Sequence, residues 1–240
     1  MRERRDMLTF ETVNELTLKV TCTGGGVLFT KAGSFIAGDN PGGKNYKFEK
    51  VLLGPQSSLG QAVLGNIVRR VTKENIPLMK ATFSGDSVTY YANYGKHVVI
   101  YHLEAGETVS VESENILAFT QDCDYSVRFI GVGVLSQKGF ATSTLTARGK
   151  EAYVAVLADG NPIVISNVLS QNTLSVDPDA VVCWIGRGPC DPRVAADISW
   201  KTFIGQASGE SYQFEWSGGQ AVTVIVQPSE RMGGIQIGMD

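Results

Sequence analysis

The sequence predicts an all-β protein built from tandem units, and three observations lead to this prediction. Short runs rich in β-branched and aromatic residues alternate with glycine or Asn/Asp turns, about every 8 to 12 residues. A similar pattern of residues returns after about 65 to 70 residues. One segment alone has the period of an amphipathic helix. Together these features are typical of sandwiches, barrels and jelly rolls.

The expected strands share alternating apolar residues bounded by turn residues, and the 27 glycines suit a fold with many tight turns. They are residues 16–20, 88–94, 97–103, 108–113, 152–157, 162–168 and 221–227.

One short amphipathic helix is expected around residues 58–73. Its apolar residues Leu59, Val63, Ile67 and Val71 recur every four positions. Such a helix either docks on its own sheet or lies at a subunit or membrane interface. Docking is the better interpretation, because a lone helix in a β protein usually covers a sheet face.

A short sequence motif recurs around three glycines, Gly85, Gly149 and Gly218. In each copy an aromatic or small apolar residue and one variable residue precede the glycine, and polar residues and a strand-like run follow it. A second set of strings has nearly the same spacing: residues 109–120 match residues 174–185, and residues 28–39 are a looser third copy. Two independent markers at one period predict three copies of a β unit.

The period divides the chain into three predicted β repeats. The first spans residues 1–95 and includes the helical insertion, the second spans residues 96–160, and the third spans residues 161–240 with a C-terminal tail. Each unit alone would be a marginal domain with exposed sheet edges, which neighbouring copies would close. Either three units close within one chain, or several chains share a ring.

Composition excludes some partners and compartments. The net charge of −3 gives no electrostatic footprint for nucleic acid. No run approaches 18 apolar residues, and the charged N-terminus does not look like a secretory signal. The four cysteines, none at CxxC spacing, are expected to be free thiols, so a cytoplasmic protein is expected.

A catalytic or metal site is not expected. His97 and His102 are five residues apart in one predicted strand, which places them on opposite faces. Cys123 stands between Asp122 and Asp124, which raise its pKa and weaken it as a nucleophile. The sequence therefore predicts no enzyme activity, no metal and no cofactor.

The loop at residues 186–192 is the most unusual candidate site. Arg187, Cys190 and Asp191 lie there among two glycines and two prolines. The loop either binds a small anion through Arg187 and backbone N–H groups, or it is a tight connection. In the second interpretation, which we favour, Arg187 and Asp191 pair with each other or with a neighbouring subunit.

Residues 103–119, LEAGETVSVESENILAF, resemble the L-x-x-G-E…LAF signature of the AIM24 (DUF124) family. Residues 28–38, LFTKAGSFIAG, resemble a corner of that family, with Gly33 as the shared glycine. The resemblance implies three TRAP-like units per chain, each a short double-stranded β-helix, and a trimer that forms a nine-unit ring. Family members in organelles are linked to mitochondrial membrane organisation. The sequence departs from the family pattern at Gly25–Gly26, where the family usually has Gly-Glu.

These observations predict a non-enzymatic, homotrimeric scaffold protein. The alternative is a module that binds a small ligand in clefts between repeats or subunits. Its candidate cleft residues are aromatic: Tyr90, Tyr91, Tyr94, Trp184, Trp200 and Trp216. Peripheral attachment to a membrane through residues 58–73 is a further possibility.

Overall fold

A computed structural model describes residues 7–51, 78–130, 140–188, 190–196 and 212–228. Within these ranges the chain forms 19 β-strands and two 3-10 turns, and every strand pairing is antiparallel. The all-β class is therefore confirmed. The predicted helix at 58–73 lies outside the described residues.

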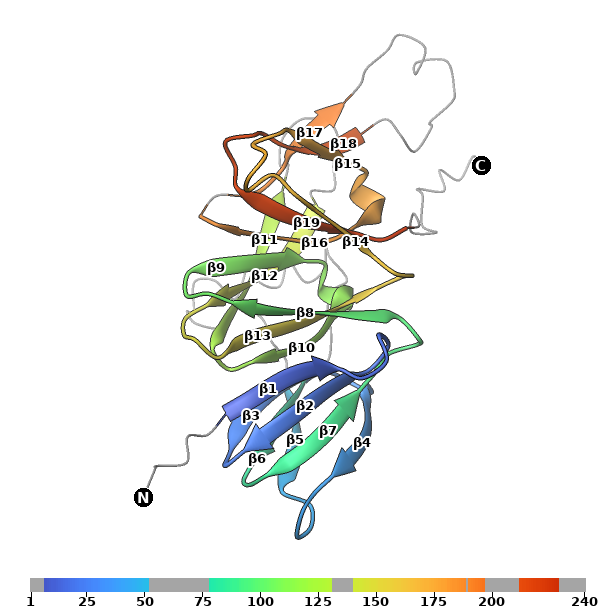
Figure 1. Ribbon diagram of the computed structural model, residues 1–240, viewed down its shortest axis with the longest axis vertical. Helices are drawn as coiled ribbons and strands as arrows, with labels where there is room; N and C mark the ends of the chain where they lie inside the picture. The colour runs from blue at the N-terminus through green and yellow to red at the C-terminus, as the bar shows by residue number, and fades with distance from the viewer. Residues whose placement is uncertain (1–6, 52–77, 131–139, 189, 197–211, 229–240) are drawn as a thin grey trace, which may run out of the picture.

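Three groups of strands follow one another along the long axis of the molecule (Figure 1). The first group contains β1 (Met7–Thr12), β2 (Leu18–Thr23), β3 (Gly26–Lys31), β4 (Phe35–Asp39), β5 (Tyr46–Val51), β6 (Leu78–Phe83) and β7 (Ser87–Tyr91). The second contains β8 (His97–Leu103), β9 (Glu107–Val111), β10 (Ile116–Thr120), β11 (Cys123–Ile130), β12 (Phe140–Ala147) and β13 (Ala152–Ala158). The third contains β14 (Ile163–Ser166), β15 (Leu174–Val176), β16 (Val181–Arg187), β17 (Arg193–Ala196), β18 (Tyr212–Trp216) and β19 (Val222–Val226).

The strands form four sheets, two of which join neighbouring groups. The end sheets have the orders β1-β2-β7-β4 and β15-β18-β17. The two six-stranded sheets have the orders β5-β6-β3-β10-β13-β8 and β11-β12-β9-β16-β19-β14. The pairing of β3 with β10 therefore links the first group to the second, and that of β9 with β16 links the second to the third.

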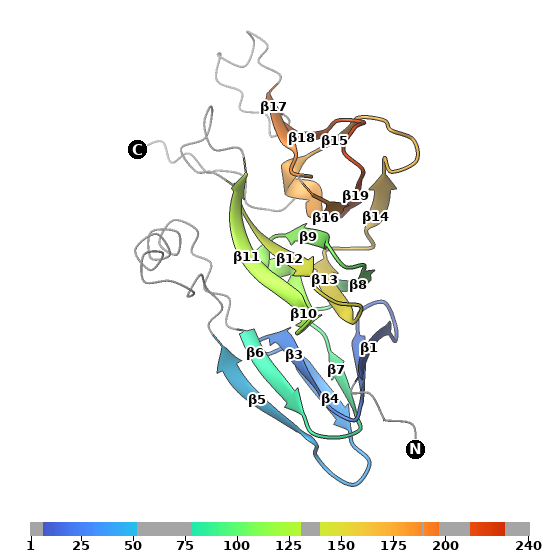
Figure 2. The same ribbon diagram turned by 90° about the vertical axis from the view of Figure 1, so that its left-hand side faces the viewer.

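The same strand order occurs in all three groups. The order β2-β7-β4 corresponds to β8-β13-β10 and to β14-β19-β16. Likewise, β3-β6-β5 corresponds to β9-β12-β11 and to β15-β18-β17. In a view turned by 90°, β5 and β11 lie on one side of the molecule and β8 and β14 on the other (Figure 2).

A register irregularity lies at the corresponding place in each group. It occurs between Phe35 and Ala37 in the β4–β7 pairing, between Ile116 and Ala118 in β10–β13, and between Val181 and Cys183 in β16–β19. The residue that each irregularity skips is Ile36, Leu117 or Val182. Such bulges bend a strand and increase its local twist, so the three strands turn at matching positions.

The hydrophobic core continues across the boundaries between groups. Leu8 and Phe10 of β1 pack with Ala155 and Leu157 of β13 in one buried cluster. The Phe10 ring stacks on Tyr153, with ring centres 5.2 Å apart. A second cluster joins residues of β9, β12 and β13 to Val182 and Cys183 of β16. Neighbouring groups thus share both sheets and core, which positions the candidate sites between them.

Candidate functional site

The Arg187 loop connects β16 to β17 and lies against the second group of strands. Arg187 pairs with Glu107 in the β16–β9 register. Its Nη2 donates to Oε2 of Glu104, and its Nε lies 3.9 Å from Oε1 of Glu107. The guanidinium is thus neutralised by carboxylates of the preceding strand group, an arrangement suited to a structural connection rather than to anion capture.

Cys190 and Asp191 contribute backbone groups to the same connection. The Cys190 carbonyl accepts a hydrogen bond of 2.8 Å from Nε1 of Trp216, which is fully buried, and the Asp191 carbonyl accepts from Nε2 of Gln220 at 3.0 Å. Cys190 itself is buried and fills the space beside Gly186, where a Cβ would lie 2.9 Å from the Cys190 Cβ. The loop is therefore packed onto β18 and onto the turn that follows β18.

The two histidines lie apart and have separate partners. His97 is half-buried, with Nδ1 4.0 Å from Oε2 of Glu15. His102 is exposed; its ring stacks on Tyr153 with centres 4.3 Å apart, and its Nε2 contacts the Lys150 carbonyl at 2.5 Å. Among the described residues no cluster of His, Cys, Asp or Glu could hold a metal ion.

All four cysteines are buried free thiols. Burial raises the pKa of Cys123 to about 12; Asp122 and Asp124 add to the rise, while a hydrogen bond with Thr120 and the charge of Arg148 oppose it. Burial also raises the pKa of Cys183. At neutral pH both thiols are protonated, which leaves them weak nucleophiles and poor metal ligands.

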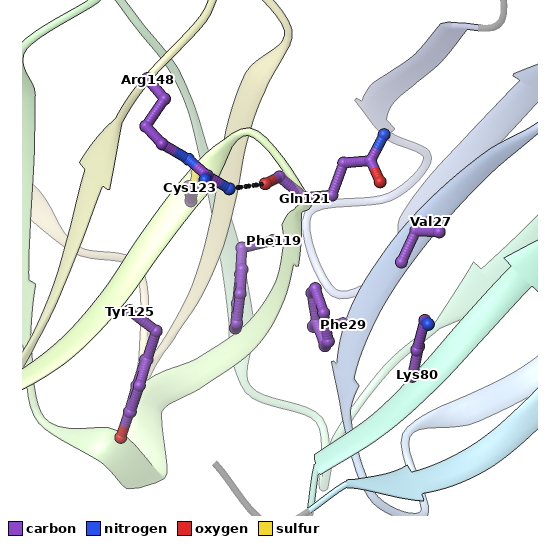
Figure 3. A pocket seen from close by; sticks show the side chains of 8 residues that line it. All are labelled: Val27, Phe29, Lys80, Phe119, Gln121, Cys123, Tyr125 and Arg148. Carbon is purple, nitrogen blue, oxygen red and sulfur yellow. Dashed lines mark hydrogen bonds between the residues drawn. The ribbon is translucent and has the colours of Figure 1, made fainter. Parts of the chain in front are cut away.

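A pocket of about 340 Å³ lies where β3 of the first group meets β10 of the second (Figure 3). Phe29 and Phe119 stand opposite each other in the register, and their rings stack with centres 5.1 Å apart. Tyr125 of β11 continues this aromatic wall at 6.3 Å from Phe119. Phe119 is a core residue with 1% exposure, so the apolar surface open to a ligand comes from the half-buried rings of Phe29 and Tyr125.

Two cations line the same pocket, Lys80 and Arg148. Arg148 is held in place: Nη2 donates to the Gln121 carbonyl at 2.8 Å, and Nε lies 3.2 Å from Oδ1 of Asp124. Lys80 has no ion-pair partner in the described part of the chain. The Lys80 ammonium is therefore the cation of this pocket that is available to an anionic ligand.

The aromatic residues predicted to line clefts have different environments. Trp184, Trp216 and Tyr91 are core residues with exposed fractions of 3%, 0% and 0%, whereas Tyr94 is 95% exposed. Tyr90 is half-buried, and Trp200 lies outside the described residues. Phe29, Phe119 and Tyr125 were not predicted from the sequence as residues of a cleft. The matching strings at 28–39 and 109–120 contained the first two, but nothing in the sequence indicated that their strands pair.

The fold is an antiparallel β assembly of three serially joined strand groups, and it has known relatives. The family model described as "Mitochondrial biogenesis AIM24" matches residues 10–229, so the chain belongs to the AIM24 family, as the resemblance indicated. A crystal structure of a Streptococcus pyogenes protein aligns with a TM-score of 0.63 at 18% identity, covering 94% of each chain. This likeness shows the fold alone. No curated protein gives a significant match. In the described ranges, no helix has the length and hydropathy needed to cross a membrane.

Proposed function

We propose that this chain is a non-enzymatic scaffold that assembles as a homotrimeric ring, with three TRAP-like units per chain. The three strand groups would be those units. The predicted boundaries near residues 95 and 160 fall between β7 and β8 and between β13 and β14, which agrees with this division. The number of chains follows from the family resemblance.

The observation that carries the proposal is a pairing position left unfilled at each end of the molecule. In the described part of the chain, β10 and β16 each pair on both sides, but the corresponding β4 pairs with β7 alone. At the other end β15 pairs only with β18, whereas β3 and β9 have two neighbours. A pairing position that is filled inside the chain and open at its ends is typical of a unit that polymerises or closes a ring.

The mass of the full-length chain in solution tests this function. Light scattering coupled to size exclusion is expected to give about three times the chain mass of 25.8 kDa at micromolar concentration. A mass equal to one chain, unchanged by raising the concentration, would contradict the scaffold proposal. If the expected mass is found, purification of the complex from its native cells would identify the proteins that the ring holds. We propose that this complex lies in the cytoplasm and contains no nucleic acid.

A second candidate function is binding of a small ligand in the pocket between β3 and β10. The half-buried Phe29 and Tyr125 rings, with Lys80 in the same lining, favour a flat organic anion. A thermal-shift screen against aromatic carboxylates and nucleotides tests it, with Lys80→Ala as the variant and Lys44→Ala as the control. Stabilisation of the wild type and of Lys44→Ala, lost in Lys80→Ala, supports binding. Absence of any shift removes this candidate.

Membrane attachment through residues 58–73 stays a prediction, to be checked by flotation with anionic liposomes.

A further inference from the structure

We infer that β15 of one chain adds as an antiparallel strand to the outer edge of β4 of the next chain, with Ser175 opposite Gly38. Every contact in the assembly is then head to tail. This inference rests on the proposed homo-oligomer and specifies its interface.

The correspondence between strands identifies which edges are meant to pair. The bulge and the strand order place β4, β10 and β16 in equivalent positions, and the strand order does the same for β3, β9 and β15. Inside the chain, β3 pairs with β10 and β9 pairs with β16. The next pairing in this series joins β15 to a β4, and the only β4 left is that of another copy.

In the described part of the chain, three equivalent edges are open, one in each group, and carry charges that discourage pairing. These are β5, β11 and β17; β5 carries Lys47, Glu49 and Lys50, β11 carries Asp124, and β17 begins with Arg193. By contrast, β15 has no charged residue, and β4 has only Asp39 at its end. Charged residues are a common protection of an edge that is meant to stay open. The strands β8 and β14 are also edges without Asp, Glu, Lys or Arg, so the absence of charge separates β4 and β15 only from β5, β11 and β17. The series of pairings inside the chain is what assigns β15 to β4.

The exposure of apolar residues at the bulge supports the same conclusion. Leu117 and Val182, the skipped residues of β10 and β16, are 0% and 1% exposed, but Ile36 in β4 is 55% exposed. Phe35 of β4 is also 36% exposed. The equivalent apolar positions are buried wherever a neighbouring strand group is present, so a second copy would bury Ile36 and Phe35 in the same way.

The register follows from the two pairings inside the chain. Phe29 lies opposite Phe119, and Ser110 lies opposite Trp184. The strings 28–39, 109–120 and 174–185 align without gaps, so Phe29, Ser110 and Ser175 are equivalent, as are Gly38, Phe119 and Trp184. This alignment sets Ser175 opposite Gly38, with Val176 opposite Ala37 and Leu174 opposite Asp39.

Gly38 agrees with this placement. A Cβ there would lie 2.5 Å from the Tyr46 hydroxyl, so β4 has no side chain where β10 and β16 have an aromatic ring. Ser175 is small and exposed. Neither residue obstructs an incoming strand.

A charge at the interface tests the inference. Ile36→Glu is compared with Val164→Glu, which changes an apolar residue of similar exposure, 58%, on the uncharged edge strand β14. Light scattering is expected to show one chain mass for Ile36→Glu and the wild-type oligomer for Val164→Glu. An intact Ile36→Glu oligomer, or dissociation by Val164→Glu, would overturn the interface. If the wild type is itself a monomer, the proposed function fails instead.

Mixing two blocked chains tests the head-to-tail geometry. Ser175→Pro blocks β15, because a proline in the strand cannot donate a backbone hydrogen bond. Each variant alone is expected to be a monomer, and an equimolar mixture with Ile36→Glu is expected to form a dimer containing one of each. A Ser175→Pro homodimer would indicate β4–β4 pairing and contradict the inference. Circular dichroism checks that each variant folds, and Ser175→Glu replaces Ser175→Pro if proline prevents folding.

Discussion

At Gly218 the backbone leaves no space for a side chain. A Cβ there would lie 1.8 Å from the carbonyl oxygen of Gln171. That carbonyl belongs to a loop held by the buried Asn167, whose Nδ2 donates to the Asn172 carbonyl at 3.1 Å and to the Ser217 carbonyl at 3.2 Å. The loop therefore cannot move aside without breaking the hydrogen bonds of the buried Asn167 side chain.

Gly218→Ala is expected to lower the free energy of unfolding by about 3 kcal/mol, at the upper end of the usual cost of overpacking. The matched control is Gly219→Ala, because a Cβ at Gly219 meets no atom within 4 Å. Its effect is expected to stay within about 0.5 kcal/mol. Denaturant unfolding of both variants measures the difference, and equal stabilities would show that the turn is not rigid.

The three glycines of the recurring sequence motif have different environments. A Cβ at Gly149 would lie 2.7 Å from the carboxylate of Asp122, which is too close. A Cβ at Gly85 would lie 3.4 Å from the Asn45 side chain, near an ordinary contact distance. The sequence could mark these turns, but it could not rank them. The residue that contacts each glycine comes from a part of the chain outside the motif.

The buried thiols give a prediction on reactivity. The sequence pointed to Asp122 and Asp124 as the reason for a high Cys123 pKa, whereas burial is the larger cause. Because the folded-state pKa lies near 12, almost no thiolate is present at neutral or mildly alkaline pH. A thiol reagent at pH 8 is expected to modify none of the four cysteines in the folded protein and all of them in denaturant. Rapid reaction of the folded protein would contradict this picture.

At the scale of the strands, local pattern was informative and pairing was not. The seven predicted segments overlap β2, β7, β8, β9, β13, β14 and β19. The Ser/Thr-rich β12 had no apolar alternation to reveal it. Its polar side chains are buried because they find partners: Ser143 contacts the Tyr125 hydroxyl at 2.9 Å, and Thr144 donates to the Ser126 carbonyl at 3.3 Å. Such pairing is a tertiary property that a single sequence does not display.

The Arg187 loop illustrates the same limit. Its composition marked it as unusual, but its partners Glu104 and Glu107 lie in the preceding strand group. Because the Arg187 and Glu104 side chains are 58% and 77% exposed, the ion pair is expected to contribute little.

A double-mutant cycle measures the Arg187–Glu104 pair. Arg187→Gln, Glu104→Gln and the double variant are expected to give a coupling free energy below about 1 kcal/mol that decreases with salt. Phosphate should stabilise the wild type and Arg187→Gln equally. Selective stabilisation of the wild type by phosphate would favour the anion-binding interpretation instead.

At the scale of the whole molecule, the strand groups share sheets and core at both boundaries, although the third group also has a buried cluster of its own around Trp184, Phe214 and Trp216. The sheets cross both boundaries through the β3–β10 and β9–β16 pairings, and Leu8 and Phe10 pack on the strand group that follows their own. Periodicity in the sequence predicted three copies of a β unit, which stays a prediction, and the structure shows three strand groups with the same strand order. Periodicity could not show that neighbouring strand groups share sheets, because that depends on which edges meet in space.

Shared sheets predict that the strand groups unfold together. All three tryptophans follow residue 160, so tryptophan fluorescence reports on the third group, whereas far-UV circular dichroism reports on every strand. Separate domains would give displaced transitions, but groups that share sheets and core should lose structure in one cooperative step. We expect the two denaturation curves to coincide, both in the wild type and in Leu18→Ala, which opens a cavity at a fully buried position of β2 in the first group. In Leu18→Ala, a fluorescence midpoint that stays at the wild-type value while the dichroism midpoint falls would show that the third group folds on its own.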